Sequence, residues 1–189
     1  DYPGIKGSTP QNQIEHARFL KELGVNINFA PVADTAFEPD SVMKDRSAGS
    51  KPEEVAKGVA QIVGIQKDNG VESTLKHFPG HGRTSGDSHQ LTPAINISKS
   101  KWLKSDYLPF KSGISAGAEN IMTGHLIFPK ISQENVTVSR TWLTDILRGE
   151  LAYKGRIVTD DLKMDGLQLP EKLECEGSEE PITSESKSE

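Results

Sequence analysis

Residues 76–89 have the sequence KHFPGHGRTSGDSH and begin inside a strand-like segment at residues 72–78. The stretch combines lysine, histidine and aspartate, which are costly to bury unpaired, with glycine and proline, which interrupt regular structure. Exposed turn residues are the simpler explanation for histidines in such a loop. The Lys-His pair at one end and the Asp-x-His pair at the other favour instead a strand end that leads into a binding or catalytic loop.

Helix-like and strand-like segments alternate on both sides of this loop. Apolar residues recur at helical spacing, as in Val55, Val59 and Ile62, and residues 50–53 have the pattern of a capping box. We expect helices at residues 10–23, 50–70, 99–117 with a break near Pro109, and 139–147 with Ser139 as its cap; the expected strands are 25–32, 72–78, 120–124 and 156–159. This alternation predicts an α/β fold in which crossover helices join parallel strands.

Ionisable side chains recur where the expected strands end. They are, in chain order, Asp34, Lys76, His77, His125, Asp160 and Asp161. In a (β/α) barrel the carboxyl ends of the strands converge on the face that holds the active site, and an open α/β sheet also places ligands there. Either arrangement predicts that these side chains meet in one cleft.

The charge of the chain is unevenly distributed. The net charge of −5 equals the balance of seven Glu and two Lys within residues 171–189, so the other 170 residues are near neutral. A neutral body gives no electrostatic case for a nucleic-acid partner. We therefore expect a catalytic domain at residues 1–168 and an acidic, disordered tail at residues 169–189. No apolar run approaches the ~20 residues of a membrane span.

The single cysteine, Cys175, excludes an internal disulfide and is compatible with a reducing compartment. It favours a cytoplasmic location. The chain begins at Asp1 without a signal-like apolar segment, so we expect a processed or truncated product, and secretion stays open. For the full-length protein we expect a monomer.

Asp160 and Asp161 are adjacent at the end of a strand, where neighbouring side chains point to opposite faces. Only one of them is therefore expected to face the centre of the cleft. A carboxylate in that position can act as a nucleophile, a metal ligand or a structural anchor. Asp161 has a structural alternative, because an aspartate there could cap a helix that starts at Leu162.

The Asp87 and His89 pair suits proton transfer, because a carboxylate beside an imidazole makes a tuned donor or acceptor near neutral pH. Together with a carboxylate on a rigid strand, such a pair suits double-displacement hydrolysis of a glycoside. Arg46, Lys76 and His77 are donor-rich groups that suit sugar hydroxyls.

Zinc is the rival use of the same histidines. A zinc site could be formed from His77, His81, Asp87 and His89. Their spacing matches no compact zinc motif, however, and Lys76 beside such a site would oppose a cation. We expect no metal and no cofactor.

Residues 76–89 resemble the signature of glycoside hydrolase family 3, in the β-N-acetylhexosaminidase branch that removes N-acetylglucosamine during peptidoglycan recycling. Four further segments are similar to that family: NFAPVAD at 28–34, KDRS at 44–47, MTGHLIFP at 122–129 and VTDDLKM at 158–164. The resemblance covers residues 1–168 and implies a (β/α)8 TIM-barrel type fold acting on carbohydrate substrates.

The resemblance also implies roles for individual residues. Asp160 matches the nucleophile that forms a covalent glycosyl-enzyme, and His89 supported by Asp87 matches the general acid/base. The residues that match the holders of the terminal N-acetylglucosamine are Asp34, Arg46, Lys76 and His77. In this branch hydrolysis proceeds with retention and without a metal.

The chain departs from the family in the number of strands. A barrel of this kind needs roughly 250 residues, and only four β/α units are identified here. Four strands cannot close a barrel, so we expect a partial barrel with two open edges from a longer gene product. A catalytically silent sugar-binding remnant and a metal-dependent hydrolase stay as alternatives to a retaining glycosidase.

Overall fold

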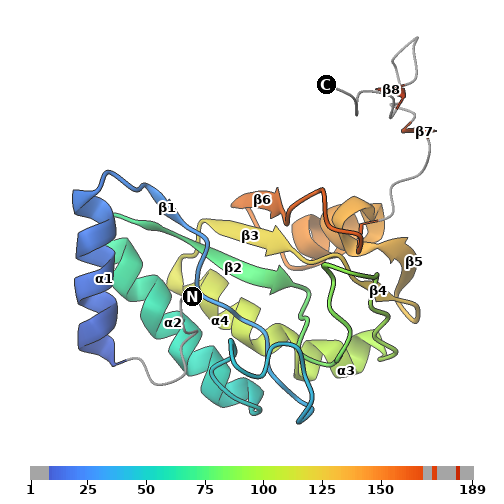
Figure 1. Cartoon of the computed structure of the whole chain (residues 1–189), viewed down its shortest axis with the longest axis horizontal. Coiled ribbons are helices and arrows are strands. Elements are labelled where there is room, and N and C mark those ends of the chain that lie inside the picture. The colour runs from blue at the N-terminus through green and yellow to red at the C-terminus, as the bar shows by residue number, and fades with distance from the viewer. Residues whose placement is uncertain (1–8, 168–171, 174–181, 184–189) are drawn as a thin grey trace.

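A computed structural model describes residues 9–167, 172–173 and 182–183. Its centre is a parallel sheet with the strand order β1-β2-β3-β6 (Figure 1). The strands are β1 (Ile27–Asn28), β2 (Glu72–Phe78), β3 (Asn120–Thr123) and β6 (Arg156–Thr159). Each strand pairs in parallel with the next one along the chain. This is the arrangement of consecutive units in a (β/α) barrel, and the predicted partial barrel is confirmed.

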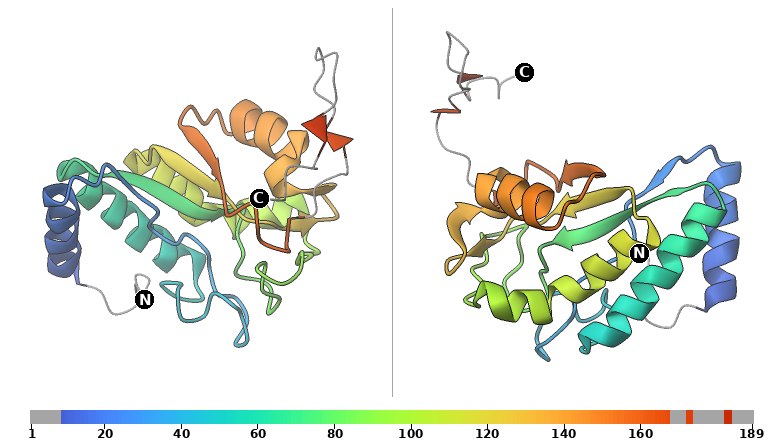
Figure 2. Two further views of the ribbon diagram at one scale, coloured as in Figure 1. Left: turned by 45° about the horizontal axis from the view of Figure 1, so that its top comes forward. Right: turned by 180° about the vertical axis from the view of Figure 1, so that it is seen from behind.

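Helices precede β1 and connect the strands. They are α1 (Pro10–Glu22), α2 (Pro52–Asp68), α3 (Lys99–Lys104), α4 (Tyr107–Ala116) and the π-helix η2 (Thr141–Glu150). Figure 2 shows that α2, α4 and η2 cover the same face of the sheet, as helices of a barrel cover its outer surface. A short antiparallel pair, β4 (Ile127–Phe128) and β5 (Ser132–Asn135), and the 3-10 turn η1 (Val136–Val138) lie between β3 and η2.

Two predicted helix starts are wrong. The capping box expected at residues 50–53 does not form, because Lys51 occupies the N-cap of α2 and makes no side-chain cap bond. Pro52 instead starts the helix with a preset φ and without an N–H that would need a partner. Ser139 does not cap η2 either, because its hydroxyl donates to Glu134 Oε2 at 2.8 Å and the helix starts at Thr141.

Proline explains the other differences between the expected and observed elements. The strand expected at residues 25–32 is regular only in β1, since Pro31 has no N–H to give to a ladder. The segment still runs beside β2, because Ala33 N–H donates to the Lys76 carbonyl at 2.6 Å. The predicted break near Pro109 is confirmed, and the chain leaves the helix at Ser105, the position that a Pro109 ring would crowd.

The core between sheet and helices is built on aromatic rings. Phe78, at the end of β2, packs edge to face on Trp102, Phe110 and Trp142, with ring centroids 6.0, 5.5 and 5.9 Å away. All four rings are fully buried. Trp102 also donates its indole N–H to the Pro79 carbonyl at 2.7 Å. The aromatic cluster therefore anchors the end of β2, where the polar loop begins.

Both outer strands of the sheet have one unpaired edge within the described part of the chain. β1 pairs only with β2, and β6 pairs only with β3. Beyond residue 167 the structure describes β7 (Lys172–Leu173) and β8 (Ile182–Thr183), which pair antiparallel. The rest of the expected acidic tail, and the boundary near residue 168, lie outside the described residues. None of the described helices has the length and apolar character to cross a bilayer.

Replacing Phe78 by alanine should lower the free energy of unfolding by about 3–5 kcal/mol, because the change leaves a cavity under three aromatic rings. Urea denaturation followed by tryptophan fluorescence measures this loss. Phe19→Ala is the matched control, since the Phe19 side chain is 56% exposed and its loss should cost at most about 0.5 kcal/mol. Equal losses in the two variants would contradict the role given to Phe78.

Candidate functional site

The fully buried carboxylate of Asp34 lies at the centre of the candidate site. It accepts the backbone N–H groups of His77 and His81, at 3.2 and 2.7 Å, and the imidazole Nδ1 of His77 at 2.7 Å. Burial alone would raise the pKa of Asp34, but the two histidines outweigh it, and the pKa lies below its usual value. Asp34 is thus an ionised acceptor that joins the end of the β1 segment to the end of β2.

His77 presents its other ring nitrogen to the cleft. A carboxylate can only accept, so His77 donates from Nδ1 to Asp34, and Nε2 is left for other partners. Nε2 lies 3.4 Å from Arg46 Nη2 and 3.8 Å from Asp160 Oδ2. The His77 imidazole therefore lies between two parts of the site. Asp34 and Arg46 follow β1, and Asp160 follows β6.

Lys76 is half-buried beside this cluster, and its pKa is affected by the charges of the neighbouring residues. Burial lowers its pKa first, and the Arg46 cation lowers it further, while Asp160 and Asp34 act in the opposite direction. Arg46 is held near by its neighbour Ser47, whose hydroxyl donates to the Asp34 carbonyl at 2.6 Å. The structure thus brings together five of the predicted site residues: Asp34, Arg46, Lys76, His77 and Asp160.

Asp160 faces this cluster and Asp161 does not. Asp160 directly follows β6. Its N–H donates to the Thr123 carbonyl at 3.2 Å, and its Oδ1 accepts the Asp161 N–H at 2.9 Å. Its Oδ2 is the oxygen directed at His77. Asp161 is exposed and accepts the Lys163 N–H at 2.9 Å, which closes a turn and starts no helix. The helix-cap alternative for Asp161 is therefore wrong.

His125 is a buried bridge between two segments. Its Nδ1 lies 2.8 Å from Thr137 Oγ1, and its Nε2 lies 3.0 Å from the Asp161 carbonyl oxygen. The ring is fully buried. His125 follows a strand, as expected, but both of its nitrogens are used to connect the β3 loop with the chain after Asp160.

Asp87 and His89 form the predicted pair on their loop. Asp87 Oδ1 lies 2.7 Å from His89 Nδ1 and accepts the His89 backbone N–H at 3.0 Å. These two hydrogen bonds lower the pKa of Asp87. The side chains are well exposed, 65% for His89 and 39% for Asp87. Because Nδ1 is engaged, Nε2 is the nitrogen that can reach a substrate.

The loop of this pair docks onto the chain that follows Asp160. Gly166 N–H donates to the Ser88 carbonyl at 3.0 Å, and Thr92 Oγ1 donates to the Gly166 carbonyl at 2.7 Å. No hydrogen bond or ion pair among residues 9–167 joins Asp87 or His89 directly to Asp160. The Asp87–His89 pair and the strand-end cluster are therefore connected only indirectly, through the loop that carries the pair.

Arg83 is a loop anchor that sequence reasoning missed. It donates to both carboxylate oxygens of Asp106 at 2.9 Å and to Ser105 Oγ at 3.0 Å, and its guanidinium lies 3.7 Å above the Phe37 ring. Burial raises the pKa of Asp106, although Ser105 and Arg83 act to lower it. The signal was a lone arginine inside a Gly-rich loop, which does not identify its distant partner.

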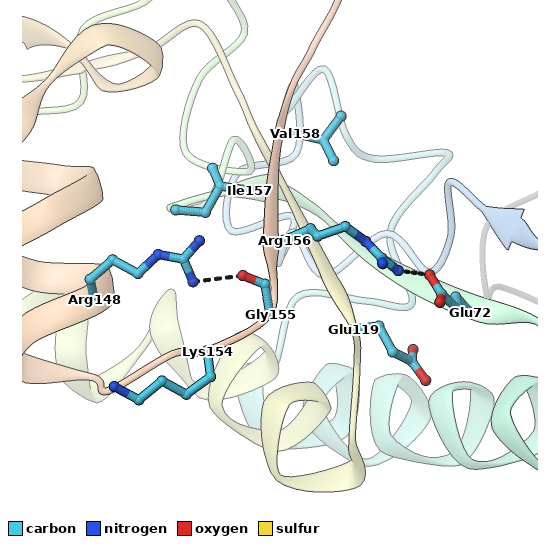
Figure 3. Close-up of a pocket in the computed structure, with 8 residues that line it drawn as sticks. All are labelled: Glu72, Glu119, Arg148, Lys154, Gly155, Arg156, Ile157 and Val158. Carbon is cyan, nitrogen blue, oxygen red and sulfur yellow. Dashed lines mark hydrogen bonds and ion pairs between the residues drawn. The ribbon is translucent and has the colours of Figure 1, made fainter.

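A hollow lies at the other end of the sheet (Figure 3). It measures about 700 Å³ and is lined by Glu72, Glu119, Arg148, Lys154, Gly155, Arg156, Ile157 and Val158. Among its charged groups, Arg156 forms an ion pair with Glu72, and Arg148 donates to the Gly155 carbonyl. It contains none of the predicted site residues. The amino ends of barrel strands serve stability, so we give this hollow no catalytic role.

The histidines proposed for a zinc site are divided among separate partners. His77 bonds Asp34, His81 lies 3.0 Å from Ser88 Oγ, and His89 bonds Asp87. In the described ranges, no three His, Cys, Asp or Glu side chains are grouped in a way that could hold a metal ion.

The Asp34→Asn variant should be less stable at neutral pH by about 2–3 kcal/mol, because an amide cannot replace a carboxylate that accepts three N–H groups. The folded pKa of Asp34 lies below the ordinary 3.8, so its stabilisation is complete above that value and is lost as the pH falls through the folded pKa.

The difference in unfolding free energy between the wild type and Asp34→Asn should therefore be smaller near about pH 3 than near about pH 5. Urea titrations at several pH values measure it, and the other carboxylates cancel in the difference. A difference that is the same at about pH 3 and about pH 5 would contradict the lowered pKa of Asp34.

Comparison with known proteins supports one family. The model of the glycosyl hydrolase family 3 N terminal domain matches residues 11–179. A beta-hexosaminidase from Stenotrophomonas maltophilia is 37% identical over 145 residues, which are 77% of this chain and 43% of that protein. One from Nitrosospira multiformis is 35% identical over 78% of this chain and 42% of its own length. The chain thus spans less than half the length of these curated relatives.

Solved structures agree with this likeness. A glycoside hydrolase family 3 beta-N-acetylglucosaminidase from Paenibacillus sp. superposes with a TM-score of 0.79 at 36% identity, covering 86% of this chain and 32% of that one. Native NagZ from Neisseria gonorrhoeae gives a TM-score of 0.76 at 32% identity, with 82% and 46% covered.

Proposed function

The chain belongs to glycoside hydrolase family 3, and we propose that its strand-end site hydrolyses terminal β-linked N-acetylglucosamine from peptidoglycan-derived or related glycosides, with retention. The observation that carries the proposal is the meeting of Asp160, at the end of β6, with the donor-rich cluster around His77. The Asp87–His89 pair lies on a loop docked against the chain that follows Asp160.

In the proposed mechanism, Asp160 Oδ2 attacks the anomeric carbon and forms a covalent glycosyl-enzyme. The protonated His89 gives its Nε2 proton to the departing oxygen, and the neutral ring then takes a proton from the water that cleaves the intermediate. Asp87 orients the ring through Nδ1 and stabilises its positive charge. The carboxylate held by two bonds from His89 is suited to this task.

Charge explains why an imidazole suits this site. A retaining enzyme already needs one anion at the reacting carbon, here Asp160. A second carboxylate nearby would be driven towards its neutral form by like-charge repulsion. A neutral imidazole avoids that repulsion as a base, and the imidazolium can still protonate the leaving oxygen.

We propose that Arg46, Lys76 and His77 bind the hydroxyl and acetamido groups of the sugar. Their donors lie around Asp160 and Asp34, and Lys76 is half-buried there, which lowers its pKa. Asp34 stays a predicted sugar ligand. Its oxygens offer about four acceptor positions, and three protein N–H groups already use them, so a sugar hydroxyl would take the remaining position.

Asp160→Asn should lower the turnover of 4-nitrophenyl N-acetyl-β-glucosaminide by at least about 10³-fold, because an amide cannot serve as the nucleophile. The neighbouring Asp161→Asn is the matched control. It removes the same charge one residue away, from a carboxylate that closes an exposed turn, and should leave turnover close to that of the wild type.

The same assay with and without a chelator separates the alternatives. Wild-type turnover that survives the chelator and depends on Asp160 supports a retaining glycosidase. Sugar binding without turnover would overturn hydrolysis and indicate a binding remnant. Turnover that is lost on chelation would indicate a metal-dependent hydrolase.

A further inference from the structure

We propose that His81 and Ser88 form an anchor pair, a set of positioning residues that holds the Asp87–His89 acid/base pair in place. The inference rests on the proposed function and adds two residues to it. His81 Nε2 lies 3.0 Å from Ser88 Oγ, and the two residues are only 1% and 4% exposed. Ser88 stands between Asp87 and His89 in the chain, so the exposed pair is built around a buried middle residue.

The backbone of Ser88 forms the second attachment. Its carbonyl accepts the Gly166 N–H, six residues after Asp160. A Cβ at position 166 would lie 2.2 Å from the Ser88 oxygen, so only glycine permits this approach. Gly166 is itself held, because its carbonyl accepts Asn135 Nδ2 at 2.9 Å. Ser88 thus connects the acid/base loop to the chain that follows Asp160.

His81 forms the third attachment. Its backbone N–H donates to Asp34 Oδ1 at 2.7 Å, while its side chain reaches Ser88. A continuous path of contacts therefore runs from Asp34, beneath the sugar-holding cluster, through His81 and Ser88 to Gly166. Changing the His81 side chain interrupts this path and leaves the backbone bond to Asp34 available.

Stabilisation of the fold alone does not explain a histidine at position 81. Its Nδ1 is buried without a hydrogen-bond partner in the described structure, and burial lowers its pKa. A buried polar atom without a partner costs free energy, which an apolar side chain of similar size would not. The His81 imidazole does bond Ser88 through Nε2, and this bond favours a role in positioning Ser88.

Hydrogen–deuterium exchange of this chain tests the anchor directly. In His81→Gln the amide reaches about as far as Nε2 and can keep the bond, whereas the shorter amide of His81→Asn cannot. Ser88→Ala removes the partner, and Ser88→Thr restores the hydroxyl. The exposed Gln90→Ala is the control within the same loop.

Amide exchange at residues 87–91 should become about tenfold faster or more in His81→Asn and Ser88→Ala, as expected when a local unit loses a closing contact. It should stay near the wild-type rate in His81→Gln, Ser88→Thr and Gln90→Ala, and the amides of β2 should not change. If the amides of residues 87–91 exchange in His81→Asn at the wild-type rate, the proposal is overturned.

A leaving-group comparison tests the consequence for the reaction. The value of kcat/KM is measured for a 2,4-dinitrophenyl and a 4-methoxyphenyl N-acetyl-β-glucosaminide. A misplaced proton donor slows the poor leaving group more, whereas partial unfolding lowers both values equally. In His81→Asn the ratio of the two values should change by about tenfold, and His81→Gln should restore it.

Equal loss for both substrates would overturn the positioning role. Absence of wild-type turnover would instead overturn the proposed function for this chain. In that case the exchange experiment still decides whether His81 and Ser88 hold the loop.

Discussion

A buried carboxylate organises the site. Asp34 accepts three N–H groups from two residues of the β2 end and its loop, and its burial would be unfavourable without them. This one group aims the His77 ring at Asp160, fixes the backbone at His81 and terminates the β1 segment beside β2. The residues proposed to bind the sugar and the loop of the proposed acid/base pair therefore depend on the same carboxylate, although they lie on different elements.

Much of the architecture could be predicted from local pattern. The four parallel strands and their connecting helices follow from apolar periodicity, and the strand-end positions of Asp34, Lys76, His77 and Asp160 follow from the strands. The orientation of Asp160 relative to Asp161 was expected from the alternation along a strand, and the structure decides which of the two faces the cleft. These features depend on neighbours in sequence, which is why a single chain reveals them.

What escaped prediction depends on partners that the local sequence pattern does not identify. Ser139 has the composition of a helix cap, but Glu134 takes its hydroxyl. His125 has the position of a site residue, yet Thr137 and the Asp161 carbonyl use its ring. Gly166 looks like an ordinary turn glycine until the loop that carries Ser88 is packed against it. In each case that contact decided between two interpretations that the local sequence supported equally well.

The position of Asp160 on an outer strand has a consequence for how the site becomes competent. β6 is supported by β3 along one edge only, within the described residues, so the proposed nucleophile stands on the side of the sheet with less support. Outer strands fray more easily than inner ones and are ready templates for another strand. A segment added to that edge would steady the reacting carboxylate together with the sheet. Completion of the sheet and ordering of the proposed nucleophile would then occur in the same step.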